Sequence, residues 1–242
     1  MILTTSLYGC ELLYKITGQS IDFLENTQRY FARTVQGLDK RSPSESTVAN
    51  IGLWSLIGYI DKCKLIFLGR LCNLTCNSIV KSIFCASITQ TAHSSDITSS
   101  FLSVARKYNL QRYLNSYIEQ GVFLPKDKWR KIVHDSIHIY EEQSWLYSVS
   151  LNSSMIRYMN IHCKLTYHVL WDRIFLYPRY RSILQFCLRI SSRNILSKCC
   201  ALCNKHAFDY DCHIILHCEK LLMERNKFFS YLIDTLNVDT YV

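Results

Sequence analysis

The feature that most constrains the fold is the scarcity of helix-breaking residues: the 242-residue chain has only 7 glycines and 3 prolines. These two residue types are the main ones that divide a chain into short strands and tight turns. An apolar share of 49% is enough for a sizeable core, in one large domain or two small ones. No strand pattern is strong, so we expect a mainly α fold built from long helices.

Three helices are expected within the first 75 residues. The first follows Ser20, a suitable N-cap, and ends at Gly37, a suitable C-cap. Pro43 is well placed to start the second, and the third runs over residues 55–72. The apolar stripe of the first helix would comprise Ile21, Leu24, Phe31 and Val35, with Gln28 interrupting it. In the third helix, the positions at helical spacing are Ile57, Ile60, Lys64, Leu65, Leu68 and Leu71.

The centre of the chain shows weaker signals. Residues 89–100 are polar and rich in Ser and Thr, which predicts a loop or domain boundary. Residues 97–120 carry one or two helices, Pro125 opens another, and residues 179–193 form a short basic helix. The face of the helix after Pro125 is marked by Trp129, Ile132, Val133, Ser136, Ile137 and Tyr140.

The net charge of +9 is concentrated in one segment, residues 155–198. Eight cations against one acid, Asp172, give this segment +7; the cations are Arg157, Lys164, Arg173, Arg179, Arg181, Arg189, Arg193 and Lys198. Arginine pairs with phosphates and aromatic rings offer stacking platforms, so this mixture suits RNA or single-stranded DNA. The alternative is an amphipathic helix with core aromatics and solvated arginines. The adjacent residues 198–218, which are rich in cysteine and histidine and form a possible zinc site, favour the nucleic-acid interpretation.

The N-terminal residues MILTTSLYGCELLYK lack a basic region and a clean apolar core, so no signal peptide is expected. No run of eighteen apolar residues occurs in the sequence, so we expect no membrane-spanning helix and no membrane partner. An intracellular location, in the cytoplasm, the nucleus or both, follows as an expectation. The 12 cysteines are then expected to be reduced thiols or metal ligands.

Five cysteines and three histidines lie within residues 198–218. Cys200 and Cys203 form a CxxC pair, whose spacing lets two thiolates reach one tetrahedral ion. His213 and Cys218 would complete a closed structural zinc site. On a regular helix His213 and Cys218 lie about 140° apart, so they require a helix end or turn. Other available ligands are Cys199, His206, Cys212 and His217, and a CxxC with HxxxH is the alternative set. The cluster could also consist of buried cysteines and histidines that bind no metal.

Motifs of common active sites are absent from the sequence. There is no GxxxxGK[ST], GxGxxG, HExxH or GxSxG, and no carboxylate pair of the two-metal kind. His134 and His138 are four residues apart and could share a helix face with Asp135 and Glu141 nearby, but further metal ligands are lacking. We therefore expect no catalytic residues.

Several segments together resemble a known family. SLYGCELLYK, IDFLENTQRYFARTVQGL, KRSPSE and IGLWSLIGYIDKCKLIFLGRL resemble the region downstream of the polymerase palm in reverse transcriptases of non-LTR (LINE-type, jockey-like) retrotransposons. CALCNKHAFDYDCHIILHCEKLLMERNKFF resembles the cysteine-histidine motif that closes many of those proteins, with Arg225 at the position of a following arginine. The resemblance covers residues 6–77 and about 186–230.

This resemblance implies a helical, thumb-like bundle followed by further helices and a small CCHC zinc-binding module. The expected regions are 1–88 (thumb-like), 89–178 (helical linker) and 179–242 (basic helix and zinc module). The linker region is expected from length and helicity alone, and its start from the polar segment at residues 89–100. The resemblance also implies structural zinc held by Cys200, Cys203, His213 and Cys218, with Cys199, Cys212 and His217 set aside.

The family's activity is RNA-directed DNA synthesis carried by palm aspartates, and the F/YxDD motif is absent from this sequence. We therefore expect a C-terminal fragment that is not an enzyme by itself. Its expected partner is RNA or single-stranded DNA, contacted through Arg173, Arg179, Arg181, Arg189, Arg193 and Lys198. The alternative function is a host-adopted, zinc-binding protein-interaction module. The sequence does not indicate an oligomeric state.

Overall fold

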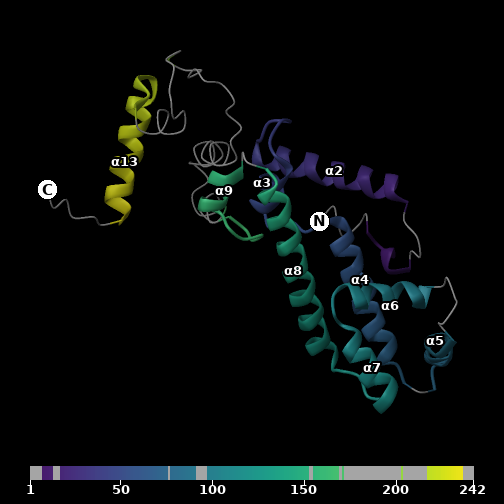
Figure 1. Ribbon diagram of the computed structural model, residues 1–242. Helices are drawn as coiled ribbons and strands as arrows, with labels where there is room; N and C mark the ends of the chain where they lie inside the picture. The colour runs from purple at the N-terminus through teal and green to yellow at the C-terminus, as the bar shows by residue number, and fades with distance from the viewer. Residues whose placement is uncertain are drawn as a thin grey trace.

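The computed structural model describes residues 7–12, 17–75, 77–90, 97–152, 155–168, 171, 203 and 217–236. Its first helices are η1 (Cys10–Leu12), α2 (Gly18–Gln36), α3 (Ser44–Ala49), α4 (Leu56–Cys72), α5 (Ile79–Gln90), α6 (Ile97–Lys107) and α7 (Gln111–Gln120). They are followed by α8 (Lys126–Ser150), α9 (Ile156–Ile161), η5 (Glu219–Leu221) and α13 (Leu222–Leu236) (Figure 1). Within the described ranges there is no strand beyond an isolated antiparallel bridge between Ile51 and Tyr167. The predicted mainly α fold class is confirmed.

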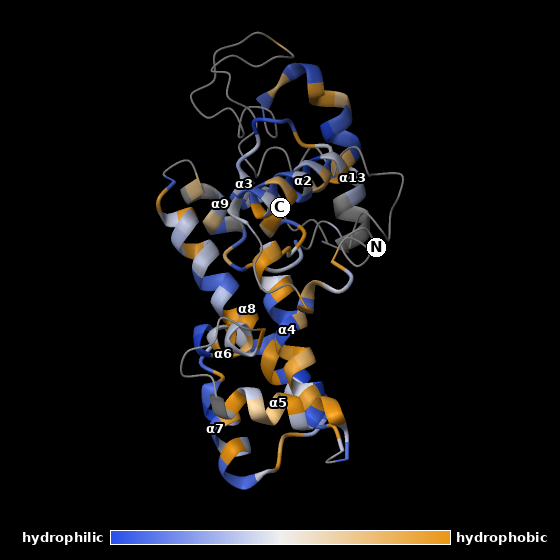
Figure 2. Ribbon diagram, turned by 90° about the vertical axis from the view of Figure 1, so that its right-hand side faces the viewer, coloured by the Kyte–Doolittle hydropathy of each residue, from blue (hydrophilic) through white to orange (hydrophobic). Residues whose placement is uncertain are grey.

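Helix α4 is the centre of the described core. It packs against α8, α6, α2, α5 and η1, and Figure 1 shows α4 and α8 side by side. Hydrophobic residues dominate α4 (Figure 2), and Leu65 and Leu68 are completely buried. Because α6 and α8 follow residue 89 and share this core with α4, the packing is continuous across the expected thumb-like and linker regions.

Two glycines of α4 allow α8 to approach closely. Gly58 and Gly69 are eleven residues apart, about three helical turns, so they lie on the same face. A Cβ at Gly69 would lie 2.2 Å from Cδ1 of Trp129, and one at Gly58 would lie 2.7 Å from Oε1 of Glu141. Nε1 of Trp129 also donates a hydrogen bond to the Leu65 carbonyl at 2.8 Å. The buried indole is therefore fixed against the backbone of α4.

Helix α2 is stabilised at both ends by local contacts. Thr17 is the N-cap, since its Oγ1 accepts a hydrogen bond from the backbone N–H of Ser20 at 3.3 Å. The predicted cap, Ser20, instead lies within the first turn, so the predicted start is three residues late. Gly37 ends the helix in the left-handed conformation with φ 65°, as predicted.

The buried face of α2 differs from the predicted apolar stripe. Phe31 and Val35 are exposed, whereas Gln28, Ala32 and Gln36 are buried. The Gln36 amide donates to the Ala32 and Thr47 carbonyls, and the Gln28 amide donates to the Trp54 carbonyl. These glutamines fit interior positions because their buried amide groups are bonded to backbone carbonyls.

The predicted helix after Pro125 is confirmed as α8, and Pro125 is its N-cap. Its buried residues follow a strict four-residue spacing: Trp129, Val133, Ile137, Glu141, Trp145 and Val149. Tyr140, predicted to face the core, is exposed and packs edge-on against Tyr108 instead. The predicted face is therefore displaced toward Tyr140, and it omits the buried residues Glu141, Trp145 and Val149.

The segment after α5 is more helical than its polar composition suggests. Residues 97–120 form two helices, α6 and α7, as one of the two expected arrangements. Helix α5 extends to Gln90 and α6 starts at Ile97, so both ends of the predicted 89–100 loop are helical. Between α6 and α7, Asn109 adopts φ 58°, a conformation that asparagine tolerates better than most residues. Among the described helices, none combines the length and apolarity needed to cross a membrane.

Candidate functional site

Two of the four predicted zinc ligands lie within the described residues. Cys203 is half-buried, and Cys218 is completely buried directly before η5 and α13. Cys200 and His213 lie outside the described residues, as do the alternative ligands Cys199, His206 and Cys212. The described part of the chain holds no group of three or more Cys, His, Asp or Glu side chains placed to bind a metal.

Arg225 connects helix α13 to the backbone of Cys218. Its Nη2 donates a hydrogen bond to the Cys218 carbonyl, which also accepts one from the Leu221 N–H at 3.1 Å. Cys218 is the N-cap of η5, with φ −67° and ψ 115°, and the preceding His217 is exposed. The backbone at Cys218 is therefore held by the first turns of the helix that follows it.

The predicted nucleic-acid-binding residues all lie outside the described residues: Arg173, Arg179, Arg181, Arg189, Arg193 and Lys198. The described beginning of the 155–198 segment belongs to the core. Tyr158 is completely buried, its hydroxyl donates to Oδ1 of Asn50 at 2.7 Å, and Trp171 is 5% exposed. Trp171, a candidate stacking platform in the sequence, is therefore a core side chain, while Lys164 is exposed.

Two neighbouring histidines dock the segment after α9 onto the loop after α3. The rings of His162 and His168 lie 4.9 Å apart. Nε2 of His162 lies 3.3 Å from the Ala49 carbonyl, and the His168 N–H donates to the Asn50 carbonyl at 3.0 Å. Gly52, with φ 61°, lets the backbones approach, since a Cβ there would lie 3.0 Å from the Tyr167 nitrogen. The described part of the basic segment is thus fixed on the core.

Because His162 and His168 are docked in this way, we expect the folded protein to lose stability in acid. Burial, with a smaller contribution from His162, lowers the pKa of His168 to about 4, and burial also lowers the pKa of His162. Because unfolded histidine titrates near 6.5, the unfolded chain binds more protons below that pH, and stability falls as pH drops from about 6.5 toward 4. For His168 alone we expect a loss of about 2 kcal/mol by pH 5.

Urea unfolding between pH 7 and pH 4.5 measures this loss of stability. A His168→Gln variant should lose less stability over this interval than the original chain, because it lacks the titrating imidazole. Equal losses in the two proteins would show that protonation of His168 does not contribute to the loss of stability in acid.

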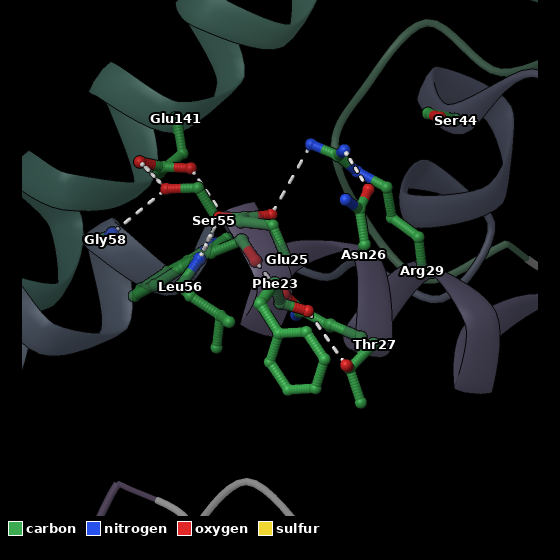
Figure 3. A network of polar contacts seen from close by, with 12 residues as sticks. Phe23, Glu25, Asn26, Thr27, Arg29, Ser44, Ser55, Leu56, Gly58 and Glu141 are labelled. Carbon is green, nitrogen blue, oxygen red and sulfur yellow. Dashed lines mark hydrogen bonds and ion pairs between the residues drawn. The ribbon is translucent and has the colours of Figure 1, made fainter. Parts of the chain in front are cut away.

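A cavity of about 230 Å³ lies between α2, α3, α8 and residues 53–55. Two carboxylates on its wall, Glu25 from α2 and Glu141 from α8, converge on the N-terminus of α4 (Figure 3). Glu141 accepts hydrogen bonds from the Ser55 N–H at 2.8 Å and from the Ser55 hydroxyl at 2.9 Å. Glu25 accepts one from the Leu56 N–H at 2.7 Å.

These contacts give both carboxylates a structural role. Ser55 is the N-cap of α4, and its Oγ accepts a hydrogen bond from the Gly58 N–H at 3.0 Å. Backbone N–H groups at a helix start lack partners within the helix, and the helix dipole favours negative charge there. Glu25 and Glu141 therefore tie α2 and α8 to the start of α4, and they do not form an acid–base pair around a reacting group.

The weaker metal candidate around His134 and His138 is not assembled. The two rings stack 6.2 Å apart beside Trp54, and Nδ1 of His134 lies 3.4 Å from Oδ1 of Asp135. Glu141 binds Ser55 instead. Sequence reasoning missed this capping role, although a glutamate within an apolar four-residue repeat is a signal for a buried, bonded carboxylate.

Comparison of the chain with protein-family models, curated proteins and solved structures finds no match.

Proposed function

We propose that the chain is the thumb-like and zinc-binding C-terminal part of a non-LTR retrotransposon reverse transcriptase, and that it binds RNA or single-stranded DNA without catalysing synthesis by itself. Zinc would be held by Cys200, Cys203, His213 and Cys218. The basic residues between Arg173 and Lys198 would contact phosphates.

The observation that carries the proposal is the contact between Arg225 and Cys218. The C-terminal resemblance rests on a final cysteine followed by an arginine, and here that arginine binds the carbonyl of that cysteine. Partners outside the first ligand shell commonly hold metal ligands in place. Burial of Cys218 beside an exposed His217 also suits a ligand set that uses the cysteine.

The charge distribution supports the nucleic-acid partner. The docked residues His162 and His168 fix the described part of the basic segment on the helical core. From Asp172 to Lys198 the chain then carries six cations and one acid, a balance of +5. A cationic segment of this kind attracts a polyanion through release of its counterions, which makes affinity depend strongly on salt.

Gel mobility of a single-stranded RNA probe at several salt concentrations tests this proposal. Removing three charges with Arg179→Gln, Arg181→Gln and Arg189→Gln should weaken binding at least about tenfold and flatten the salt dependence. The matched control removes three exposed charges from α8 with Lys126→Gln, Lys128→Gln and Lys131→Gln, and it should retain near-original affinity. No probe shift at micromolar protein and low salt, or equal losses in both triple variants, would contradict the proposal.

One observation favours the alternative, a zinc-binding protein-interaction module. Helix α2 exposes Phe23, Tyr30 and Val35, and exposed apolar side chains of this kind are typical of protein-binding surfaces. Salt-insensitive capture of a protein partner, together with no RNA shift, would support this second function over the first.

A further inference from the structure

Two cysteines that are distant in the sequence meet between η1 and α4. Helix η1 packs against α4, and both lie in the same part of the molecule in Figure 1. Cys10 of η1 is 2% exposed, and Cys63 of α4 is half-buried. The Cys63 side chain lies close enough to Cys10 to raise the pKa of its thiol. The two thiols are therefore neighbours where η1 packs on α4, although 52 residues separate them.

We propose that Cys10 and Cys63 are a redox modification site, in which a peroxide converts the pair to a disulfide that links η1 covalently to α4. A disulfide requires a sulfur–sulfur distance of about 2 Å, which neighbouring thiols on two packed helices can reach by side-chain movement. The proposal depends on neither the zinc module nor nucleic-acid binding.

The difference in exposure between the two thiols determines which one reacts with the peroxide first. Burial, with smaller contributions from Cys63 and Glu11, raises the pKa of Cys10 to about 12, so this thiol is protonated at neutral pH. The half-exposed Cys63 is the one that a dissolved oxidant reaches, and its thiolate is the reacting form. Its sulfur attacks hydrogen peroxide, the O–O bond breaks, and Cys63 sulfenic acid and hydroxide form.

The second step closes the bond. The sulfur of Cys10 loses its proton and attacks the sulfenic sulfur of Cys63, the S–O bond breaks, and water leaves. In total, two thiols are oxidised and one hydrogen peroxide is reduced to two waters. A thiol reductant reverses the reaction.

A disulfide here would close a loop from residue 10 to residue 63, which includes α2 and α3. Closing a loop of this length restricts the unfolded chain strongly. The oxidised protein should therefore melt on the order of 5–10 °C higher than the reduced protein.

Peptide mapping identifies the pair directly. The full chain is treated with one equivalent of hydrogen peroxide, alkylated and digested with trypsin. Cleavage after Lys15, Lys62 and Lys64 leaves Cys10 in peptide 1–15 and Cys63 in dipeptide 63–64, each with a single cysteine. The expected result is a linked species of these two peptides, which a reductant separates.

Variants make the test specific. Cys63→Ser and Cys10→Ser should both lose the linked species and the rise in melting temperature, whereas the exposed Cys163→Ser should keep them. Circular dichroism verifies that each variant folds, and Cys63→Ser gives the result if the buried Cys10→Ser does not fold. The proposal is overturned if peroxide leaves Cys10 reduced, or if Cys63 is linked to another cysteine or is oxidised without forming a link.

Discussion

Replacing Gly69 with alanine is expected to destabilise the protein by about 2–3 kcal/mol, although alanine normally favours a helix over glycine by about 1 kcal/mol. The added Cβ would lie 2.2 Å from Cδ1 and 2.4 Å from Nε1 of Trp129. The indole cannot simply move aside, because it is 1% exposed and bonded to the Leu65 carbonyl. Relief of the clash requires α4 and α8 to separate or the buried hydrogen bond to break.

Gly18→Ala is the matched control for this substitution. Gly18 is also helical, as the first residue of α2, and no atom beyond its chain neighbours and its own helix backbone lies within 4 Å of the position that its Cβ would take. Urea unfolding should show a large drop in midpoint for Gly69→Ala and an unchanged or slightly higher midpoint for Gly18→Ala. Similar midpoints for the two variants would mean that α8 does not approach α4 closely at Trp129.

The helix boundaries marked by glycine or proline are the part of the fold that the sequence predicts well. Gly37 ends α2 because its φ of 65° is a left-handed conformation that favours glycine. Pro43 and Pro125 directly precede helices because the fixed φ of proline suits a helix start. These are local constraints of one or two residues. They hold whatever the helix later packs against.

Which face of a helix is buried is less predictable, since it depends on the partner. On α2, hydrophobicity favours Phe31 and Val35, yet Gln28 and Gln36 are buried because carbonyls of neighbouring segments need donors. On α8, Glu141 lies inside the apolar repeat because the start of α4 needs acceptors. In both helices a polar requirement of another segment outweighs the hydrophobic pattern, and sequence periodicity contains no information about that segment.

The candidate zinc site also has one part that local sequence predicts and another part that it does not. The spacing of Cys200 and Cys203 indicates a metal pair by local geometry alone. The choice of His213 and Cys218 over neighbouring ligands came from the family resemblance and stays a prediction. The contact of Arg225 with the Cys218 carbonyl could not be read from spacing, because it requires the turn through η5.

The largest expected effect is that of Cys203→Ser, which should abolish zinc binding and unfold the segment that ends in α13. Structural zinc in small modules contributes on the order of 10 kcal/mol at neutral pH, far more than the few packing contacts of a short segment. Elemental analysis of the reduced, purified proteins should find one zinc per chain in the original protein and only traces in the Cys203→Ser variant. Hydrogen exchange should show α13 losing protection while α4 and α8 retain theirs.

His217→Ala is the matched control for Cys203→Ser, because it removes a metal-binding side chain from the same cluster. His217 is exposed and Cys218 beside it is buried, so a ligand set that includes Cys218 leaves the imidazole of His217 facing solvent. The control should keep its zinc and the protection of α13. Loss of zinc in His217→Ala but not in Cys203→Ser would exclude the proposed ligand set, and an original chain without zinc would exclude the site itself. If both variants lost zinc, the CxxC and HxxxH arrangement would be the better description of the centre, since it uses both residues.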